Sequence, residues 1–509
     1  MPRQAESSHH KIILQSFIFV IFSMIIGCGS WMAPVDFDEA INLQVAQSLS
    51  EKFSYESKLV PTKIYHDKIT TNGPIQYLMA LMIRFFGIDV GRAIGLGLLG
   101  GLAAVSIYIY SGKSFILYCL LLFSWPVFAL AHTRFMGEIF SITMIIVGMS
   151  EWHKWLDENN QLYLNWRSNR LLFSGIAFGV SISTKLFSAV VLLVLLSSLI
   201  LAKYYTPDKK ISIINYFKSI IYPLIIAYIF FFVQISFSIF HSSYEINTIF
   251  MTVKQFLLSH KRHVDGLLTS NLLQTIKHDH FFPLQTSIPA ILILMYLLML
   301  LIDFHLIFLI PAIFIVALIF FGHFDFRRLF VLIIPIMLVT FRVIKFNECC
   351  DALKKHICNR INMLVLITII VSALFFGNSY LLKLLRSFNF YGAPHNYAYI
   401  RKSKNDTTAP SRYRDELIYL INKLPGPIFV KGFLGQFPEI SLRTRTVFYD
   451  RDAAENIPLI KATTQGFLMF SAWDENVTNR NCGEIIYKEW PLVLCKFTPG
   501  KSRPVVREY

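Results

Sequence analysis

The sequence predicts an α-helical integral membrane protein with about 11 transmembrane helices and a C-terminal extramembrane α/β domain. The first observation is composition: of 509 residues, 54% are hydrophobic and only 16% are charged, whereas soluble domains carry about 25% charged residues. The second is a series of apolar runs of roughly 18 residues or more, which is enough helix for a hydrocarbon core about 30 Å thick. The third is a final segment in which short β-like runs replace the long apolar ones.

The formal net charge is +16, from 48 Lys and Arg against 32 Asp and Glu. In a soluble protein this excess would indicate nucleic-acid binding. Here most basic residues lie between apolar runs, which is the pattern of membrane topology. We therefore expect membrane lipid as a partner and no nucleic acid. The apolar content and the 7 Cys also exclude a disordered chain and a disulfide-dense mini-protein.

The first expected span, 12–32, follows a polar tail and lacks a small-residue cleavage site, so it is an uncleaved transmembrane helix rather than a signal peptide. The run 171–201 is ambiguous, because a single helix would be roughly 47 Å long and would place Lys185 in mid-membrane. Two short helices hinged at Lys185 avoid this. The remaining expected spans are 91–110, 115–131, 138–149, 220–240, 283–302, 304–321, 329–344 and 361–381.

The hinge also decides the topology. With it, the linkers 203–218 and 342–360, which carry nine Lys and Arg, are cytoplasmic, as the positive-inside rule favours. A single straight helix would instead leave on that side the six basic residues of 241–282 and 322–328. With the hinge, the N-terminus is cytoplasmic, and the segments expected outside are 35–71, 132–137, 241–282, 322–328 and the part after about residue 382.

Residues 1–383 are therefore the predicted transmembrane domain, with a first outer loop at 34–73, and residues 384–509 are the predicted extracytoplasmic domain. The run SRYRDELIYLINKLPG predicts a helix that ends at Pro425–Gly426, and PIFVKG, RTVFYD, QGFLMF and EWPLVLCKF predict strands. Cys482 and Cys495 in this outer domain form a disulfide or stay as two free thiols. Cys349, Cys350 and Cys358 fall in a cytoplasmic linker, and no cysteine spacing indicates zinc.

Three carboxylates, Asp36, Asp38 and Glu39, crowd together where the first span leaves the membrane. Apolar residues recur at helical spacing from Ala40 onward, so the acids lie at or before the start of a surface helix. One interpretation is simple capping, since helix N-termini favour anionic side chains. The other is function, because a carboxylate at headgroup depth is costly and could meet a lipid-linked substrate.

The second half of this loop, TNGPIQYLMALMIRFFG, is broken at 72–74 and then too short to span, which predicts a re-entrant or interfacial helix ending near Arg84. Arg134 and Glu138, four residues apart, either pair on one helix face or separate, with Glu138 facing the cavity of Asp38 and Arg134 facing a phosphate. Lys185 needs an anionic partner, a water-filled cavity or snorkelling to the surface. The outer mouth of a later span carries His323, Asp325, Arg327 and Arg328.

Acids and cations gathered at an outer cavity match a polyprenyl-phosphate sugar. Cations would hold the phosphate, and one carboxylate would remove the proton of an acceptor hydroxyl as its oxygen attacks the anomeric carbon. Because a phosphate leaves without being protonated, one base suffices, and the single displacement inverts the anomeric centre.

Five short motifs follow one another along the chain. In order, they are D-E-A-x-x-x-x-x-A from Asp38, G-P-x-x-Y-L from Gly73 with a final R-F-F-G, R-x-x-x-E from Arg134, G-I-A-F-x-x-x-I-S-T-K ending at Lys185, and R-L-x-x-x-x-x-P from Arg328. Together they resemble the multi-span glycosyltransferases of the GT-C type, and most closely the bacterial branch with aminoarabinose and mannose transferases. The resemblance covers roughly residues 12–345. It implies an integral enzyme, as in a bacterial inner membrane, that moves a sugar from a polyprenyl-phosphate donor to a lipid or glycan acceptor outside the cytoplasm.

By motif position, Asp38 matches the catalytic acid of the first outer loop. Glu138 matches the acid opening the fourth span, which the family often uses beside it, so the resemblance implies that both are catalytic residues. Lys185 and Arg328 match basic residues expected near the donor phosphate. Asn42 departs from the aromatic that often follows the D-E pair, and 72–74 replaces the K-P-P start of the aminoarabinose transferases. The missing lysine leaves Lys68, Arg84 and Arg134 as alternative phosphate ligands, and the candidates for contacting the acceptor or supporting the site are Glu39, Asn72 and His323.

Two other interpretations stay open. A multi-span transporter or flippase of a lipid-linked saccharide also has buried charge, but it usually shows related halves with broken helices at the midplane. An inactive homologue is expected to lack the first-loop acid, and Asp38 is present. The sequence requires no cofactor, and a divalent metal on Asp38 and Glu138 stays possible.

Overall fold

The computed structural model describes residues 2–32, 35, 37–55, 73–111, 131–158, 168–185, 213–240, 409–430, 438–444, 446, 448–450, 466–471, 482–489 and 492–497, with parts of 115–122 and 188–196. The expected spans at 283–302, 304–321, 329–344 and 361–381 lie outside this part, as does the boundary expected near residue 384. The total of about 11 spans and the sidedness therefore stay predictions.

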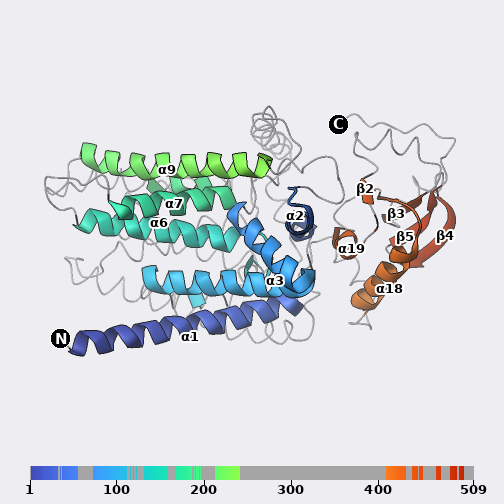
Figure 1. The fold of residues 1–509 in the computed structure, drawn as a ribbon, viewed down its shortest axis with the longest axis horizontal. Helices are drawn as coiled ribbons and strands as arrows, with labels where there is room; N and C mark the ends of the chain where they lie inside the picture. The colour runs from blue at the N-terminus through green and yellow to red at the C-terminus, as the bar shows by residue number, and fades with distance from the viewer. Residues whose placement is uncertain are drawn as a thin grey trace, which may run out of the picture.

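Five helices form a bundle in which their axes run roughly side by side (Figure 1). They are α1 (Pro2–Met32), the second arm of α3 (Gly73–Ser111), α6 (Glu138–Glu158), α7 (Asn169–Thr184) and α9 (Ile213–Phe240). Within the described part, three stretches are long and apolar enough to cross a membrane: His10–Trp31, Gly73–Tyr110 and Phe217–Phe237. The expected spans at 12–32, 91–110 and 220–240 are thus confirmed as helices.

Helices α1 and α3 pack backbone to backbone because glycines face each other at their contact. A Cβ on Gly97 would lie 2.7 Å from the carbonyl oxygen of Ser23, and one on Gly27 would lie 3.2 Å from that of Ala93. In lipid, where apolar surface gains little by leaving the solvent, such close approach is a main source of helix association.

Helix α3 folds back on itself at Gly87. Its backbone there, with φ 75° and ψ 175°, is a conformation that essentially only glycine adopts. The two arms lie against each other, since a Cβ on Gly91 would meet the Met82 carbonyl oxygen at 2.6 Å and Gly95 faces the Met79 side chain. The short helix expected at 73–87 is therefore the first arm of a helical hairpin.

Helix α7 ends at Thr184, and Lys185 is extended, with φ −148° and ψ 106°. The expected break at Lys185 is confirmed. Helix α6 runs beyond the expected 138–149, because its last turns bury Trp152 and Trp155 and pair Glu151 with Lys154 and Arg170 at 2.7 and 2.9 Å.

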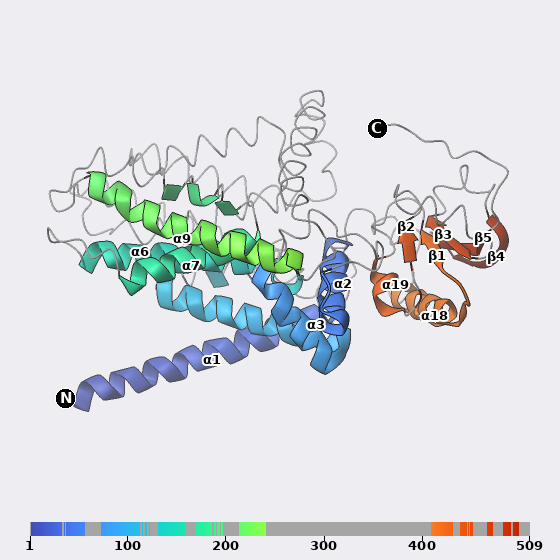
Figure 2. The same ribbon diagram turned by 45° about the horizontal axis from the view of Figure 1, so that its top comes forward.

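Helix α2 (Phe37–Lys52) lies across the end of the bundle, between it and the C-terminal elements (Figures 1 and 2). It begins at Phe37, so Asp38 and Glu39 lie in its first turn. Acidic side chains are favourable there because they complement the positive end of the helix dipole.

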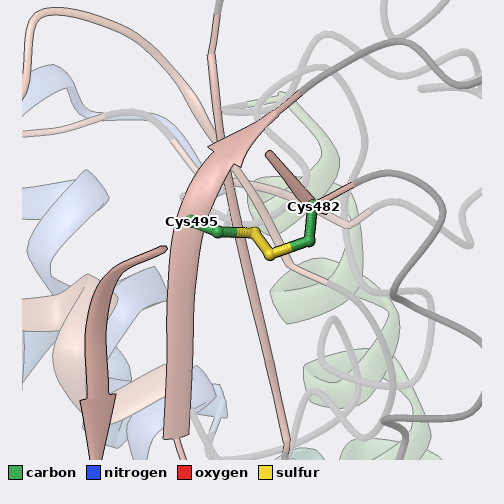
Figure 3. Close-up of a disulfide and its surroundings, with 2 residues drawn as sticks. All are labelled: Cys482 and Cys495. Atoms are coloured by element: carbon green, nitrogen blue, oxygen red, sulfur yellow. A yellow bond between two sulfur atoms is a disulfide. The ribbon is translucent and has the colours of Figure 1, made fainter. Parts of the chain in front are cut away.

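The C-terminal elements form a five-stranded sheet of order β2-β1-β3-β5-β4 with two helices. Strand β1 pairs in parallel with β2 and β3, and β5 pairs antiparallel with β3 and β4. A disulfide joins Cys482 to Cys495 (Figure 3). The element bounds are α18 (Ala409–Lys423), β1 (Ile428–Val430), α19 (Pro438–Arg443), β2 (Phe448–Asp450), β3 (Phe467–Ser471), β4 (Cys482–Glu489) and β5 (Leu492–Phe497).

These elements contact the bundle through α19, which packs on α2. Leu442 is buried in the same core as the transmembrane helices, and the Arg443 guanidinium donates to Asp89 Oδ1 at 2.7 Å, beside the Gly87 turn. The C-terminal unit therefore touches the two elements that shape the first loop.

Gly87→Ala tests the hairpin. No atom lies within 4 Å of an added Cβ, so the cost is backbone strain alone, about 1–3 kcal/mol of unfolding free energy. We expect a lower Tm in detergent. Gly426→Ala is the control, because its nearest neighbour would be 3.6 Å away. Equal Tm values for the two variants would contradict the assigned turn.

Candidate functional site

The first turn of α2 is held by a buried ion pair. Arg92 Nε donates to Glu39 Oε1 at 2.7 Å and Arg92 Nη2 donates to Glu39 Oε2 at 3.0 Å, while the exposed fractions of the two side chains are 4% and 0%. The same guanidinium donates to the carbonyl oxygens of Ser30 at 2.6 Å and Thr133 at 3.4 Å. Arg92, which belongs to α3, thus connects α3 to three other parts of the chain: the end of α1, the start of α2 and the segment before α6.

Helix α2 also clamps the backbone between Thr133 and α6. The Phe135 amide donates to Glu39 Oε1 at 3.0 Å, and Asn42 Nδ2 donates to the Phe135 carbonyl oxygen at 2.9 Å. In this turn, the Met136 amide donates a hydrogen bond to the Arg134 carbonyl oxygen at 2.8 Å, and Gly137 adopts a left-handed conformation with φ 79°. Asn42, which departs from the family pattern, therefore holds the turn that leads into Glu138.

Glu138 opens α6 and pairs with Lys185: Lys185 Nζ lies 2.7 Å from Glu138 Oε1. The helix-face pairing of Glu138 with Arg134 is wrong, because Arg134 precedes the helix and lies in the turn. Of the alternatives, the structure therefore shows an anionic partner for Lys185. Its side chain stays 23% exposed, and an ammonium has three donors, so it retains hydrogen-bonding capacity.

Three buried serines, Ser141, Ser181 and Ser188, form a hydrogen-bonded network next to this pair. Ser141, one turn after Glu138, bonds the hydroxyls of Ser181 and Ser188, and Ser181 Oγ donates to the Ser141 carbonyl at 2.9 Å. The Lys185 amide donates to the Ser181 carbonyl at 2.9 Å. A satisfied buried network of this kind is rigid, so it sets the position of the break that carries Lys185.

Of the other predicted site residues, the structure places Arg134 near Glu138 and Arg84 far from it. Arg134 is buried and lines a cavity of about 20 Å³ with His132, Gly137 and Ile139. Arg84 is exposed and donates to the Ser50 carbonyl at 3.3 Å at the far end of α2, about 16 Å along the helix from Glu39. The side chain of Asp38, and the residues Asn72, Lys68, His323 and Arg328, lie outside the described residues.

Sequence reasoning missed Arg92, the three serines and Gln76. Arg92 was visible as a lone charge in an apolar run, which is a signal for a buried partner. Gln76 is fully buried, and in the described part its amide nitrogen and oxygen have no hydrogen-bond partner. Nor does the described part contain a group of three or more His, Cys, Asp or Glu that could hold a metal.

No protein-family model matches the chain, and no curated protein sequence matches it. Among solved structures, the chain is similar to ArnT from Cupriavidus metallidurans bound to undecaprenyl phosphate, with 11% identity, a TM-score of 0.58 and coverage of 94% of this chain and 97% of that one. It is also similar to the same protein in the apo state, with 12% identity, a TM-score of 0.51 and coverage of 96% and 98%. The chain therefore has a GT-C-type fold, as its motifs predicted.

Arg92→Met tests the buried pair. It leaves the Glu39 carboxylate buried without its countercharge, which costs about 3–5 kcal/mol of unfolding free energy. We expect a large fall in Tm and in the yield of folded protein. The double variant Glu39→Gln/Arg92→Met removes both charges and should recover part of the loss. A double variant as unstable as the single one would refute the coupling.

Proposed function

We propose that this chain is a membrane glycosyltransferase that moves a sugar from a polyprenyl-phosphate donor to a hydroxyl or phosphate acceptor on the extracytoplasmic face, with inversion. The observation that carries the proposal is the pair of hydrogen bonds that Glu39 and Asn42 of α2 form with the Phe135 backbone. These contacts hold the acidic start of α2 against the turn that leads into α6, where Glu138 pairs with Lys185, within a GT-C-type fold.

Asp38 is the general base of the proposal. It lies on α2 next to Glu39, whose two carboxylate oxygens are engaged by Arg92 and Phe135. Glu39 is therefore a positioning residue, and Asp38 takes the reactive role. The Asp38 carboxylate removes the proton of the acceptor hydroxyl, the acceptor oxygen bonds to the anomeric carbon, and the bond from that carbon to the phosphate oxygen breaks with its electrons.

Cations carry the charge that the leaving phosphate gains. Lys185 is partly exposed beside Glu138, and Arg134 lies in the turn just before Glu138. Positioned cations stabilise a developing phosphate charge more strongly in an apolar site than in water. The donor in this proposal has the chemistry of undecaprenyl phosphate, the lipid held by the similar ArnT. Arg328 is proposed to act with them, and Arg84, given its place at the far end of α2, is the weaker phosphate ligand of the set.

Asp38→Asn tests the base, because it keeps the shape of the side chain and removes the proton acceptor. In membranes with matched expression, we expect transfer of radiolabelled sugar from a panel of polyprenyl-phosphate sugars to fall by about 100- to 10,000-fold. Asp89→Asn is the control, since Asp89 is 51% exposed in its pair with Arg443, and such pairs contribute little.

Each other outcome has its own meaning. A mutant as active as wild type would make Asp38 a helix-start residue only. A folded wild type that transfers no sugar from the whole panel would reject the glycosyltransferase, and saccharide transport in proteoliposomes would then be measured.

Lys185→Gln tests the phosphate contact, since the amide can still donate to Glu138 but carries no charge. Losing a hydrogen bond to a charged group costs about 1.5–3 kcal/mol, so we expect kcat/KM for the donor to fall roughly 10- to 100-fold, with much of the loss in kcat because the phosphate charge develops in the transition state. Lys154→Gln, about 24 Å from Glu138 along α6 in its pair with Glu151, should leave kcat/KM unchanged. An equal fall in both variants would indicate a general loss of membrane-surface charge.

A further inference from the structure

Gln76 is an unexplained polar group in the first arm of α3. It is 0% exposed, and neither amide atom has a hydrogen-bond partner in the described part of the chain. Burying an amide without partners destabilises the folded state. An apolar side chain of similar size would avoid this loss, so the position is costly unless a ligand completes its hydrogen bonds.

Helix periodicity places Gln76 on the side of α3 that lies between α7 and the start of α6. On one side, Gly73 packs on α7 so closely that an added Cβ would lie 2.5 Å from the Ser183 carbonyl oxygen. On the other side, Ile75 lines a cavity with Ile139 at the start of α6. At about 100° per residue, Gln76 lies on the arc between these two directions. It therefore faces the place where the end of α7 and the start of α6 meet.

Glu138 supplies a second unused hydrogen-bonding atom at that place. Its Oε1 is paired with Lys185, whereas Oε2 is buried and has no hydrogen-bond partner among the described residues. Two different helices thus direct unsatisfied polar atoms to one region: an amide that donates and accepts, and a carboxylate oxygen that accepts. The partial exposure of Lys185 gives a ligand access to it.

This combination fits hydroxyl groups and not a phosphate. A hydroxyl donates one hydrogen and accepts through its oxygen, so it can satisfy a carboxylate oxygen and either end of an amide. A phosphate offers only acceptor oxygens near neutral pH, and it would repel the Glu138 oxygen. The cations therefore suit the phosphate of the donor, whereas Gln76 and Glu138 Oε2 suit the hydroxyl groups of its sugar.

We propose that Gln76, together with Glu138 Oε2, binds hydroxyl groups of the sugar carried by the donor, which makes Gln76 a specificity-determining residue; this rests on the proposed transferase function. Sites built to bind a substrate hydroxyl discriminate strongly against analogues that lack it, because the buried polar groups are then left unpaired.

The first test needs no activity. Gln76→Leu in the full-length protein removes an unsatisfied amide, so Tm in detergent without donor should stay equal or rise. Gln44→Leu is the matched control: Gln44 is also 0% exposed and takes part in a polar interaction within the chain, so its Tm should fall. An equal fall in both variants would overturn the proposal, because Gln76 would then have a structural partner.

The second test measures kcat/KM with the parent donor and with donors that each lack one sugar hydroxyl. We expect Gln76→Leu to lose at least about 10-fold on the parent donor and little on the one deoxy donor that lacks the contacted hydroxyl. Equal fold-losses on every donor would overturn the sugar contact. If wild type itself transfers no sugar while Gln76→Leu keeps its Tm, the proposed function fails, and the sugar assignment of the unpaired amide fails with it.

Discussion

The buried pair between Glu39 and Arg92 is the interaction on which the rest of the site depends. A guanidinium in an apolar bundle is costly to desolvate, and here its donors are met by the Glu39 carboxylate and by the carbonyl oxygens of Ser30 and Thr133. These three partners lie on separate parts of the chain. Satisfying one buried charge therefore forces the first span, the first loop helix and the turn before α6 into one arrangement.

A second polar constraint acts where α6 and α7 meet. Ser141, Ser181 and Ser188 bond one another between the helices, and the backbone of Lys185 is fixed by the same serine region. Glu138 and Lys185 then neutralise each other. The two constraints are linked through the turn at 134–137, which α2 clamps on one side and α6 continues on the other.

Close backbone packing supplies the frame around these polar contacts. Gly27 and Gly97 bring α1 and α3 together, and Gly87 lets α3 return along itself. The hairpin places Asp89 at its turn, where Arg443 reaches it, and Leu442 enters the common core. The buried leucine is the more important of the two contacts, since an exposed ion pair contributes at most about 1 kcal/mol. Helix α19 of the C-terminal unit also packs on α2, the helix that bears the candidate base.

The sequence by itself determined the membrane class, the spans at 12–32, 91–110 and 220–240, the helix break at Lys185 and the helix ending before Pro425, because hydrophobic runs, periodicity and chain breakers are local properties. Only the tertiary structure decided which charges meet. Arg92 lies 53 residues from Glu39, and Lys185 reaches Glu138 in place of the nearby Arg134, because that arginine precedes the helix. The tertiary structure also decided that Gln76 is buried without a hydrogen-bond partner among the described residues. It further decided that an edge strand forms at Cys482–Glu489, a segment whose sequence has no alternation of apolar and polar residues. Such pairings depend on how distant segments pack, and no local pattern records that.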